Sequence, residues 1–320
     1  MRFFPRLIIA AAASGWAFVA AMLPAAAQDF PRQAIQVVVP MPAGGPSDTV
    51  VRLLQRATQK DLPHPMVVVN MAGAGTSLGS RKVASAPADG YTMLMNHEGL
   101  FTSSAQGIFN MGLDSLRPVA MTGLDVYTIA VQASSPYRTL ADLYEAARTK
   151  GVNAGVNIGG LNHLTSILVG RAGSVEFQPV PYRGNADALA ALLGGHIDVI
   201  FSPPSDVYGY IETGDLRILA ILGSRRIASL PDVPTAIELG YDVVSELSHM
   251  WWVPAGTSDE VVATLAQILQ KGFEDDAVSK AFEARRVERV FLTGDDLQAR
   301  VDKNSAMIQD LVKELGLAKK

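Results

Sequence analysis

Two adjacent glycines mark the first place in the chain where backbone groups could bind an anion. Gly44 and Gly45 follow a β-branched run at residues 35–39, which is typical of a strand covered on both faces. Ser47 or Asp48 is then predicted to cap the helix that follows. The start of such a helix carries unpaired N–H groups and the positive end of the helix dipole. The pattern therefore predicts an anion site, most simply for a carboxylate.

A second glycine-rich turn, at residues 70–77, follows a short apolar run and contains Gly73, Gly75 and Thr76. Its Gly-x-Gly-x-x-x-Gly spacing departs from the dinucleotide-binding pattern, and no acidic residue follows a second strand at the distance needed for a ribose contact. A nicotinamide or flavin dinucleotide is therefore disfavoured. Two interpretations stay open: a tight turn without a ligand, and a contact with a small anion.

Polar residues and glycines also follow three more predicted strands, at 91–95, near 156 and at 197–201. Because the carboxyl ends of parallel strands meet at one edge of a sheet, these positions are expected to face a common site. The candidate ligand-binding residues there are Asn96, Glu98, Gly159, Asn162, His163, Ser202 and Asp206.

The same residues offer little for catalysis. The five histidines are scattered, and no pair has the spacing of a zinc site, so neither a metal nor another cofactor is predicted. No Gly-x-Ser-x-Gly elbow is present, and Asp48 and Asp206 are favoured as helix caps over ligand contacts. An exported hydrolase that uses His97 with Glu98, or His163, is kept as the alternative from another functional class.

The N-terminal 27 residues have the pattern of a secretory signal. Arg2 and Arg6 precede an apolar run, and Ala25-Ala26-Ala27 supplies small residues for cleavage. Removing these residues changes the formal net charge from -4 to -6, because two arginines and no acidic residue are lost. An acidic chain without cysteine and without a basic stripe indicates an exported, periplasmic protein that does not bind nucleic acid.

The order of the predicted elements indicates two α/β halves. Strands alternate with helices from residue 35 to residue 95, and the alternation resumes from residue 156 to residue 222. The chain is expected to cross between the halves near Leu124 and again near Leu247. The further elements expected are strands at 117–121, 127–131, 245–253 and 287–291, and helices at 139–149, 259–271, 276–286 and 295–315.

Seven ordered motifs together resemble the TctC-like, or Bug-type, substrate-binding proteins of tripartite tricarboxylate transport systems. They extend over nearly the whole chain after residue 27, which makes them more specific than any single glycine turn. The motifs lie at residues 40–48, 70–75, 88–92, 180–184, 193–199, 230–235 and 254–257.

The resemblance implies a type II periplasmic binding protein, an α/β fold in which two lobes, each with a mostly parallel sheet, close like a Venus flytrap. Residues 28–125 and 248–320 are expected to form lobe 1, and residues 126–247 lobe 2. The implied function is capture of a small carboxylated solute by a monomer that is not an enzyme and that delivers the solute to transporter membrane subunits. A ligand-sensing subunit for a membrane sensor kinase is the other role considered.

The resemblance also implies which residues contact the solute. The turns at 43–48 and 73–76 are expected to hold its carboxylate through backbone groups and bridging waters, and those at 159–163 and 202–206 to close over its other end. The complete predicted set is Ala43, Gly44, Gly45, Ser47, Asp48, Gly73, Gly75, Thr76, Asn96, Glu98, Gly159, Asn162, His163, Ser202 and Asp206.

Two turns depart from the family pattern. Residues 96–99 replace a Ser/Thr-rich turn, and residues 157–162 replace a small, serine-rich loop. A Glu98 that faces the solute would repel a second carboxylate and accept a hydrogen bond from an amino or hydroxyl group. The predicted ligand is therefore a monocarboxylate or an amino-acid-like solute in preference to citrate.

Overall fold

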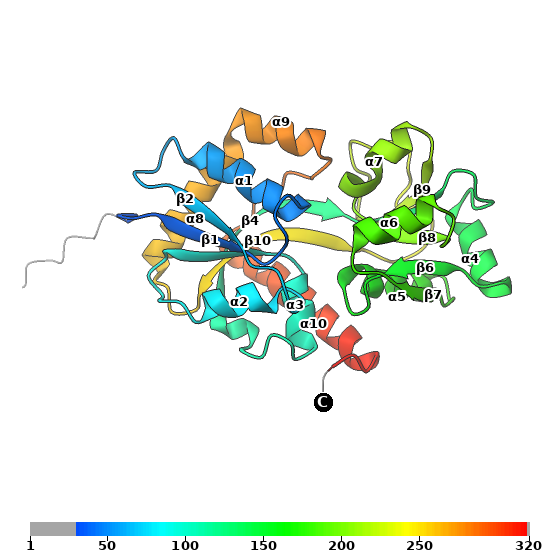
Figure 1. Cartoon of the computed structure of the whole chain (residues 1–320), viewed down its shortest axis with the longest axis horizontal. Coiled ribbons are helices and arrows are strands. Elements are labelled where there is room, and N and C mark those ends of the chain that lie inside the picture. The colour runs from blue at the N-terminus through cyan, green and yellow to red at the C-terminus, as the bar shows by residue number, and fades with distance from the viewer. Residues whose placement is uncertain (1–29, 319–320) are drawn as a thin grey trace, which may run out of the picture. The chain divides into compact units, whose positions relative to one another are not determined.

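The computed structural model describes residues 30–318, which contain two five-stranded β-sheets (Figure 1). In the first sheet the strand order is β2-β1-β3-β10-β4. β1 pairs in parallel with β2 and β3, whereas β10 lies antiparallel between β3 and β4. The strands of the first sheet are β1 Ile35–Val39, β2 Met66–Asn70, β3 Thr92–Asn96, β4 Leu116–Val126 and β10 Glu246–Pro254.

The second sheet repeats this arrangement in the order β7-β6-β8-β5-β9. β6 pairs in parallel with β7 and β8, and β5 lies antiparallel between β8 and β9. The predicted α/β fold with a mostly parallel sheet in each half is thus confirmed, although each sheet contains one antiparallel strand. The strands of the second sheet are β5 Thr128–Gln132, β6 Asn153–Val156, β7 Gln178–Pro181, β8 Val199–Ser202 and β9 Leu216–Ile221.

Helices cover the faces of both sheets. Figure 1 shows α1 and α9 on one side of the first sheet and α2, α3 and α10 on the other. The elements that accompany the first sheet are α1 Pro46–Thr58, α2 Ser77–Ala84, α3 Gly99–Ala105, the 3-10 turn η1 Leu113–Ser115, α8 Asp259–Glu274, α9 Asp276–Ala284 and α10 Gly294–Glu314. The helices of the second sheet are α4 Leu140–Thr149, α5 Leu161–Ala172, α6 Asn185–Leu193 and α7 Pro204–Glu212.

Burial on both faces explains the continuous apolar runs of the inner strands. In β8, Val199 and Phe201 pack in the core beneath α4 and α5, while Ile200 packs in the core with α6. Successive side chains of a strand point to opposite faces, so a strand between two helical layers needs an apolar residue at every position. The same reason accounts for residues 37–39 of β1, which are fully buried.

Several elements differ from the predicted ones. The strand expected at 287–291 is wrong: only two isolated bridges, from Glu288 to Leu124 and from Leu292 to Met121, join this segment to β4. β4 is the edge strand of the first sheet. Residues 289–291, between the two bridges, form no further pairs with it. Helix α3 was not predicted, because it begins within a polar turn that follows a strand, and α7 begins at Pro204, before the Asp206 that was predicted to cap a helix.

The two sheets are connected next to Tyr127. β4 ends at Val126 and β5 begins at Thr128, so one residue separates a strand of the first sheet from a strand of the second. The N–H of Tyr127 donates to the carbonyl of Ser245 at 2.9 Å, and β10 begins one residue later. Leu124 and Leu247, where crossings were predicted, lie in β4 and β10 beside this point.

Trp251 and Trp252 of β10 belong to the core rather than to a ligand site. Both are almost completely buried, and neither lines the cavity described below. Trp251 donates through its indole N–H to the Thr122 hydroxyl at 2.8 Å, and Trp252 packs edge-on against Phe101.

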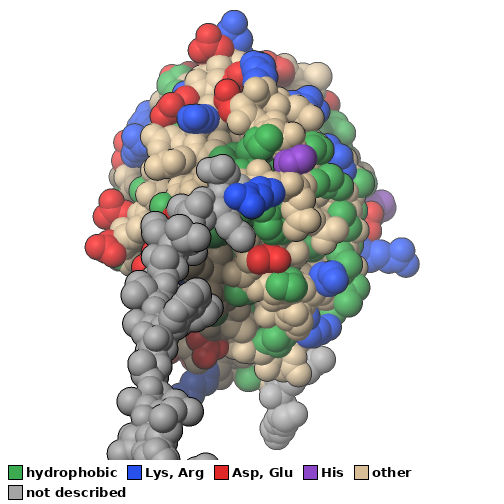
Figure 2. All heavy atoms as spheres, turned by 90° about the vertical axis from the view of Figure 1, so that its left-hand side faces the viewer, with side chains coloured by type: hydrophobic (Ala, Val, Ile, Leu, Met, Phe, Trp, Pro, Cys, Tyr) green, Lys and Arg blue, Asp and Glu red, His purple; other side chains and the backbone are tan. Residues whose placement is uncertain are grey.

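The surface in Figure 2 carries Lys and Arg side chains intermixed with Asp and Glu, with no stripe of one sign on the face shown. Within residues 30–318, none of the helices is both long and apolar enough to cross a membrane. The predicted signal sequence lies outside the described residues.

Candidate functional site

A cavity of about 790 Å³ is lined by the loops of both sheets. Its wall contains residues that follow β1, β2 and β3 of the first sheet and β6, β7 and β8 of the second. Residues of β4 and β10 and of the β4–β5 connection complete it. The volume lies within the range of small-molecule sites, and the position is the edge at which α/β sheets bind ligands.

The N-terminus of α1 contributes free backbone donors to this cavity. α1 begins at Pro46 with Gly45 as its N-cap, two residues before Ser47 and three before Asp48, the two predicted caps. Proline suits the first helical position because its missing N–H has no partner there. Among the described residues, no acceptor pairs with the N–H of Ser47 or Asp48, and the Ser47 hydroxyl is equally free. Ser47 lines the cavity, so these donors are available to an anion.

Asp48 holds the loop before α1 rather than the solute. Its carboxylate accepts hydrogen bonds from the Gly44 N–H at 2.8 Å, Arg52 Nε at 2.9 Å and Asn70 Nδ2 at 2.8 Å. Burial opposes ionisation, but the hydrogen bonds from Arg52, Gly44 and Asn70 lower the pKa of Asp48. Of the two glycines, only Gly44 requires the freedom of glycine, since its φ is +80° whereas that of Gly45 is -70°.

The turn after β2 has an unusual run of positive φ angles. Gly73, Ala74, Gly75 and Thr76 have φ values of +135°, +47°, +58° and +73°. A β-branched residue such as Thr76 rarely adopts this conformation, and such strain is typical of functional sites. Gly75 and Thr76 line the cavity, and their N–H groups have no partner within residues 30–318. Free N–H groups in such a turn form a concave site for an anion.

Asn96, at the end of β3, stabilises this strained turn from behind. Its buried side chain donates to Thr76 Oγ1 and Ser80 Oγ, both at 3.1 Å, and accepts from the His97 N–H at 2.8 Å. Asn96 does not itself line the cavity. Its predicted role as a ligand contact is therefore replaced by a positioning role.

His97 does line the cavity, as a neutral imidazole. Burial, and then the nearby His249, lower the pKa of His97 to about 4. Its Nδ1 accepts a hydrogen bond from the Gly99 N–H at 2.9 Å. The proton of the neutral ring must therefore be on Nε2, which makes His97 a hydrogen-bond donor without charge.

Glu98 occupies a different position from the predicted one. Its side chain is buried away from the cavity, where Oε2 accepts from the Ser248 N–H at 2.7 Å and Oε1 from Asn304 Nδ2 at 3.3 Å. Burial raises the pKa of Glu98, while the hydrogen bonds from Ser248 and the charge of Arg300 oppose this rise. Glu98 thus joins the start of α3 to β10 and α10, and it gives no reason for the solute to lack a second carboxylate.

The loops of the second sheet are joined by a chain of side-chain hydrogen bonds. Asn162 accepts from the Asn157 N–H at 3.0 Å and donates to Asn185 Oδ1 at 2.9 Å. Asn185 Nδ2 and Ser202 Oγ both donate to Asp206 Oδ2 at 2.9 Å. The chain fixes the orientation of three loops, after β6, β7 and β8, and leaves Asp206 Oδ1 without a partner among the described residues.

Two contacts involving Gly159 complete the arrangement. The Gly159 N–H donates to His163 Nδ1 at 3.1 Å, so His163 supports the loop without lining the cavity. The Gly159 carbonyl accepts from Gln106 Nε2, beyond α3, at 2.8 Å. This second hydrogen bond directly links the loops of the first sheet to those of the second.

The structure thus divides the predicted ligand-binding residues into two groups. Those that line the cavity are Gly45, Ser47, Gly75, Thr76, Gly159, Asn162 and Asp206. Those that lie behind or beside it are Ala43, Gly44, Asp48, Gly73, Asn96, Glu98, His163 and Ser202.

Sequence reasoning missed other polar residues of the wall. Gln106 follows an unpredicted helix, and Asn185 opens α6 after a glycine, with no local signal that distinguishes it from other residues of a helix start. Asp125 and Tyr127 lie where the pattern indicates strands, so nothing local separates them from structural residues. The polar residues added by the structure are Thr102, Ser103, Gln106, Asp125, Tyr127, Asn157 and Asn185, together with His97, which the sequence named only for the hydrolase alternative.

Comparison with known families identifies this architecture. Residues 50–317 match the family described as the tripartite tricarboxylate transporter family receptor, TctC. The chain belongs to the TctC receptor family. The resemblance seen in the ordered sequence motifs is therefore confirmed over most of the receptor's length.

Individual relatives agree with this assignment. The receptor is 32% identical to the protein BugT of Bordetella pertussis over 302 residues, which cover 92% of each chain. The solved structure of the periplasmic binding protein BugD has a TM-score of 0.78 and 28% identity, and the match covers 91% of this chain and 100% of that one. An R. palustris protein solved with adipate has a TM-score of 0.79 and 25% identity, with 91% and 99% covered.

BugD is a periplasmic binding protein, and the alternative of an exported hydrolase has little geometric support in the chain described here. His97 and Glu98 make separate contacts rather than an acid–base pair. Within residues 30–318, no serine hydroxyl hydrogen-bonds to a histidine ring, and no cluster of His, Cys, Asp or Glu could hold a metal ion.

Proposed function

We propose that this receptor captures a small carboxylated solute in the cavity and delivers it to the membrane subunits of a tripartite tricarboxylate-type transporter. The observation that carries the proposal is the convergence of free N–H groups from Ser47, Gly75 and Thr76 on one cavity. Backbone N–H groups at the start of a helix and in a turn with positive φ angles suit a carboxylate. They add no titratable side chain to the site.

The setting of this function follows from the family. We propose that the receptor acts as a periplasmic monomer after removal of residues 1–27. In this proposal residues 28–125 and 248–320 form one lobe, residues 126–247 form the other, and the solute draws the two together. The carboxylate ligand of the R. palustris relative, adipate, supports the substrate class.

A glycine substitution tests the proposed anion site. Gly45→Val places a branched side chain on the cavity wall, and φ at this position is open to any residue, so the fold should persist. Wild type should be stabilised by a saturating carboxylate from a panel of mono-, di- and tricarboxylates. At a hundred times the dissociation constant the gain is about 2.7 kcal/mol, which a thermal melt resolves. Gly45→Val should lose this gain.

Gly209→Val is the matched control. Gly209 lies in α7, does not line the cavity, and has open space where its side chain would be. This variant should respond to the carboxylate as wild type does. A Gly45→Val protein that binds with unchanged affinity would show that the α1 start is not the anion site.

A further inference from the structure

Asp125 is a buried carboxylate on the cavity wall with only half of its hydrogen-bonding capacity used. The residue lies in β4 beside the connection between the sheets and is 1% exposed. Its Oδ2 is 2.9 Å from Nε2 of His249, a fully buried residue behind the wall. Its Oδ1 has no partner in the described part of the chain. A buried carboxylate oxygen without a donor is costly, which indicates that a donor is missing.

His249 contacts one oxygen of Asp125 and not the other. His249 Nδ1 is also buried without a partner. The ring therefore offers at most one donor to Asp125, which leaves Asp125 Oδ1 without a hydrogen bond in the described part of the chain.

Asp206 places a second carboxylate on the same wall, from the second sheet. Its Oδ1 is free, because Asn185 and Ser202 both donate to Oδ2. Burial raises the pKa of Asp206, and so does the charge of Asp125, which means that the two carboxylates lie close enough to repel each other. Burial, and then the charges of Asp206, Asp125 and Glu98, raise the pKa of Tyr127, which lines the same cavity.

No cation of the protein offsets these charges on the wall. The residues that line the cavity include neither Lys nor Arg within the described range, and His97 is neutral. Donors and carboxylates occupy different parts of the wall. Ser47, Gly75 and Thr76 contribute free N–H groups, whereas Asp125 and Asp206 contribute carboxylates, and Oδ1 of Asp125 is buried without a donor. Such a wall suits a ligand that carries both a carboxylate and a positive charge.

We propose that Asp125 and Asp206 form a subsite for a ligand ammonium group, so that the solute is an amino acid rather than a dicarboxylate. The subsite rests on the proposed function, which supplies the carboxylate end of the same ligand. Tyr127 provides an aromatic wall beside it, which stabilises cations further. A dicarboxylate would instead bring a third negative charge to two existing ones.

The test compares ligands of equal length that differ in one end group. Titration calorimetry of wild type uses ω-amino acids of three to six carbons, L-glutamate and L-aspartate, the dicarboxylates glutarate and adipate, and the simple monocarboxylates butanoate and pentanoate. At least one amino acid should bind ten times more tightly than its matched acids. Asp125→Asn should reduce this preference about tenfold or more, which corresponds to about 1.4 kcal/mol per tenfold change.

Preference within one variant is the decisive readout, because a general loss of folding would weaken all ligands alike. Asp206→Asn should act in the same direction, and Asp310→Asn, an exposed residue of α10 outside the cavity, should retain the wild-type preference. Dicarboxylates that bind while amino acids do not would overturn the subsite and leave the proposed function intact. An unchanged preference in Asp125→Asn would overturn it too. Failure of every carboxylate would instead refute the proposed function.

Discussion

At the scale of single residues, hydrogen-bond partners decide what each polar side chain of the cavity can do. His97 illustrates this, because the Gly99 N–H occupies its Nδ1 and leaves Nε2–H as a donor. Glu98, the next residue, has both oxygens engaged by Ser248 and Asn304. Two adjacent ionisable residues thus have unrelated roles: a neutral donor on the cavity wall, and a tie between elements.

The neutral state of His97 predicts a dependence of stability on pH. Its pKa is about 4 in the folded protein against an ordinary value of 6.5, so the unfolded chain binds more protons between these values. The stability that His97 contributes is complete above pH 6.5 and is lost as the pH falls towards 4. Relative to His97→Gln, wild type should lose about 2 kcal/mol between pH 7.5 and pH 4.5.

Urea denaturation of both proteins at the two pH values measures this loss. The quantity to compare is the difference in free energy of unfolding between wild type and His97→Gln. Glu98 and Asp206, whose pKa values are raised, affect the stability of both proteins in the opposite direction, and their effect cancels in this difference. Their raised pKa values favour the folded state as the pH falls. A difference that stays constant across the pH range would contradict a neutral His97.

At the scale of elements, local sequence signals place the helices, and their first turns differ in how they are capped. α4 begins with a complete capping box, in which Thr139 Oγ1 accepts from the Asp142 N–H and Asp142 accepts from the Thr139 N–H. α1 and α5, at the cavity, begin with glycine and have no side-chain cap. Helix starts at the cavity thus keep their N–H groups free, whereas a start away from it satisfies them internally.

The capping box predicts a loss of stability that does not involve the ligand. Thr139→Ala removes the acceptor for the Asp142 N–H and should lower the free energy of unfolding by about 1 kcal/mol. Ser258→Ala at the start of α8 is the comparison, because its hydroxyl accepts at a longer 3.4 Å. Denaturant midpoints should fall more for Thr139→Ala. A larger loss for Ser258→Ala would mean that the capping box contributes less than its geometry indicates.

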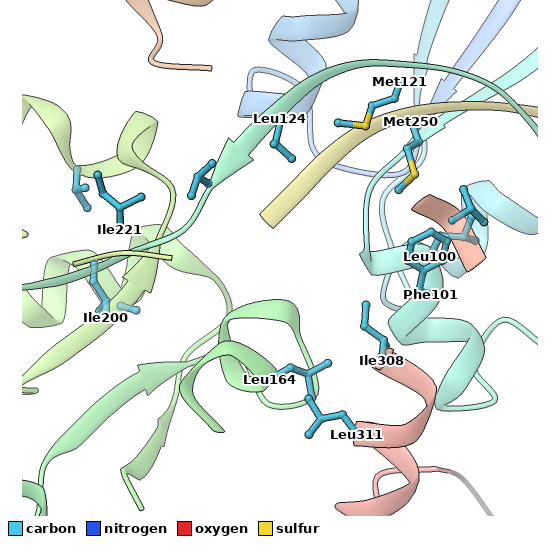
Figure 3. Packing of buried hydrophobic residues seen from close by; sticks show 14 of the residues in the cluster. Leu100, Phe101, Met121, Leu124, Leu164, Ile200, Ile221, Met250, Ile308 and Leu311 are labelled. Atoms are coloured by element: carbon cyan, nitrogen blue, oxygen red, sulfur yellow. The ribbon is translucent and has the colours of Figure 1, made fainter. Parts of the chain in front are cut away.

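At the scale of the whole receptor, few polar contacts link the loops around the cavity. A part-buried hydrogen bond joins Gln106 Nε2 to the Gly159 carbonyl. An exposed ion pair joins Arg171 of α5 to Glu314 of α10, and exposed pairs contribute little. Figure 3 shows Leu164 of α5 close to Ile308 and Leu311 of α10, all within one buried cluster. These contacts hold helices of the two sheets together in the state described here.

Gln106 is therefore expected to govern opening of the cavity. Gln106→Ala removes one part-buried hydrogen bond from the closed arrangement, worth about 1 kcal/mol, and should weaken solute binding roughly fivefold, mainly through faster dissociation. It should also enlarge the ligand-free protein in small-angle scattering, because the open population rises. The scattering result distinguishes a closing contact from a simple ligand contact.

Gln132→Ala provides the matched control for this prediction. Gln132 Nε2 also donates to a backbone carbonyl, that of Leu193, at 2.9 Å, but both residues belong to the second sheet and its helices. Neither affinity nor dimensions should change in this variant. Equal effects of the two substitutions would indicate general loosening instead of control over opening.

The sequence by itself determined most of the elements and the edge of the sheets at which the site lies. Apolar runs and glycine turns are local signals, and a strand followed by a polar turn indicates the carboxyl edge of a parallel sheet without further information. Gly45, Ser47, Gly75 and Thr76 could therefore be predicted as cavity residues. Their backbone conformation is encoded within a few neighbouring positions.

Only the tertiary structure decided which way the acidic side chains point and which are satisfied. Glu98 is turned away by Ser248, 150 residues later in the chain, and Asp125 is held by His249, 124 residues later. Neither pairing leaves a periodic or local signal, because it depends on β10 returning between β3 and β4. The charge on the cavity wall is thus a property of the assembled sheets, since a carboxylate binds a ligand only where no internal donor has taken its oxygens.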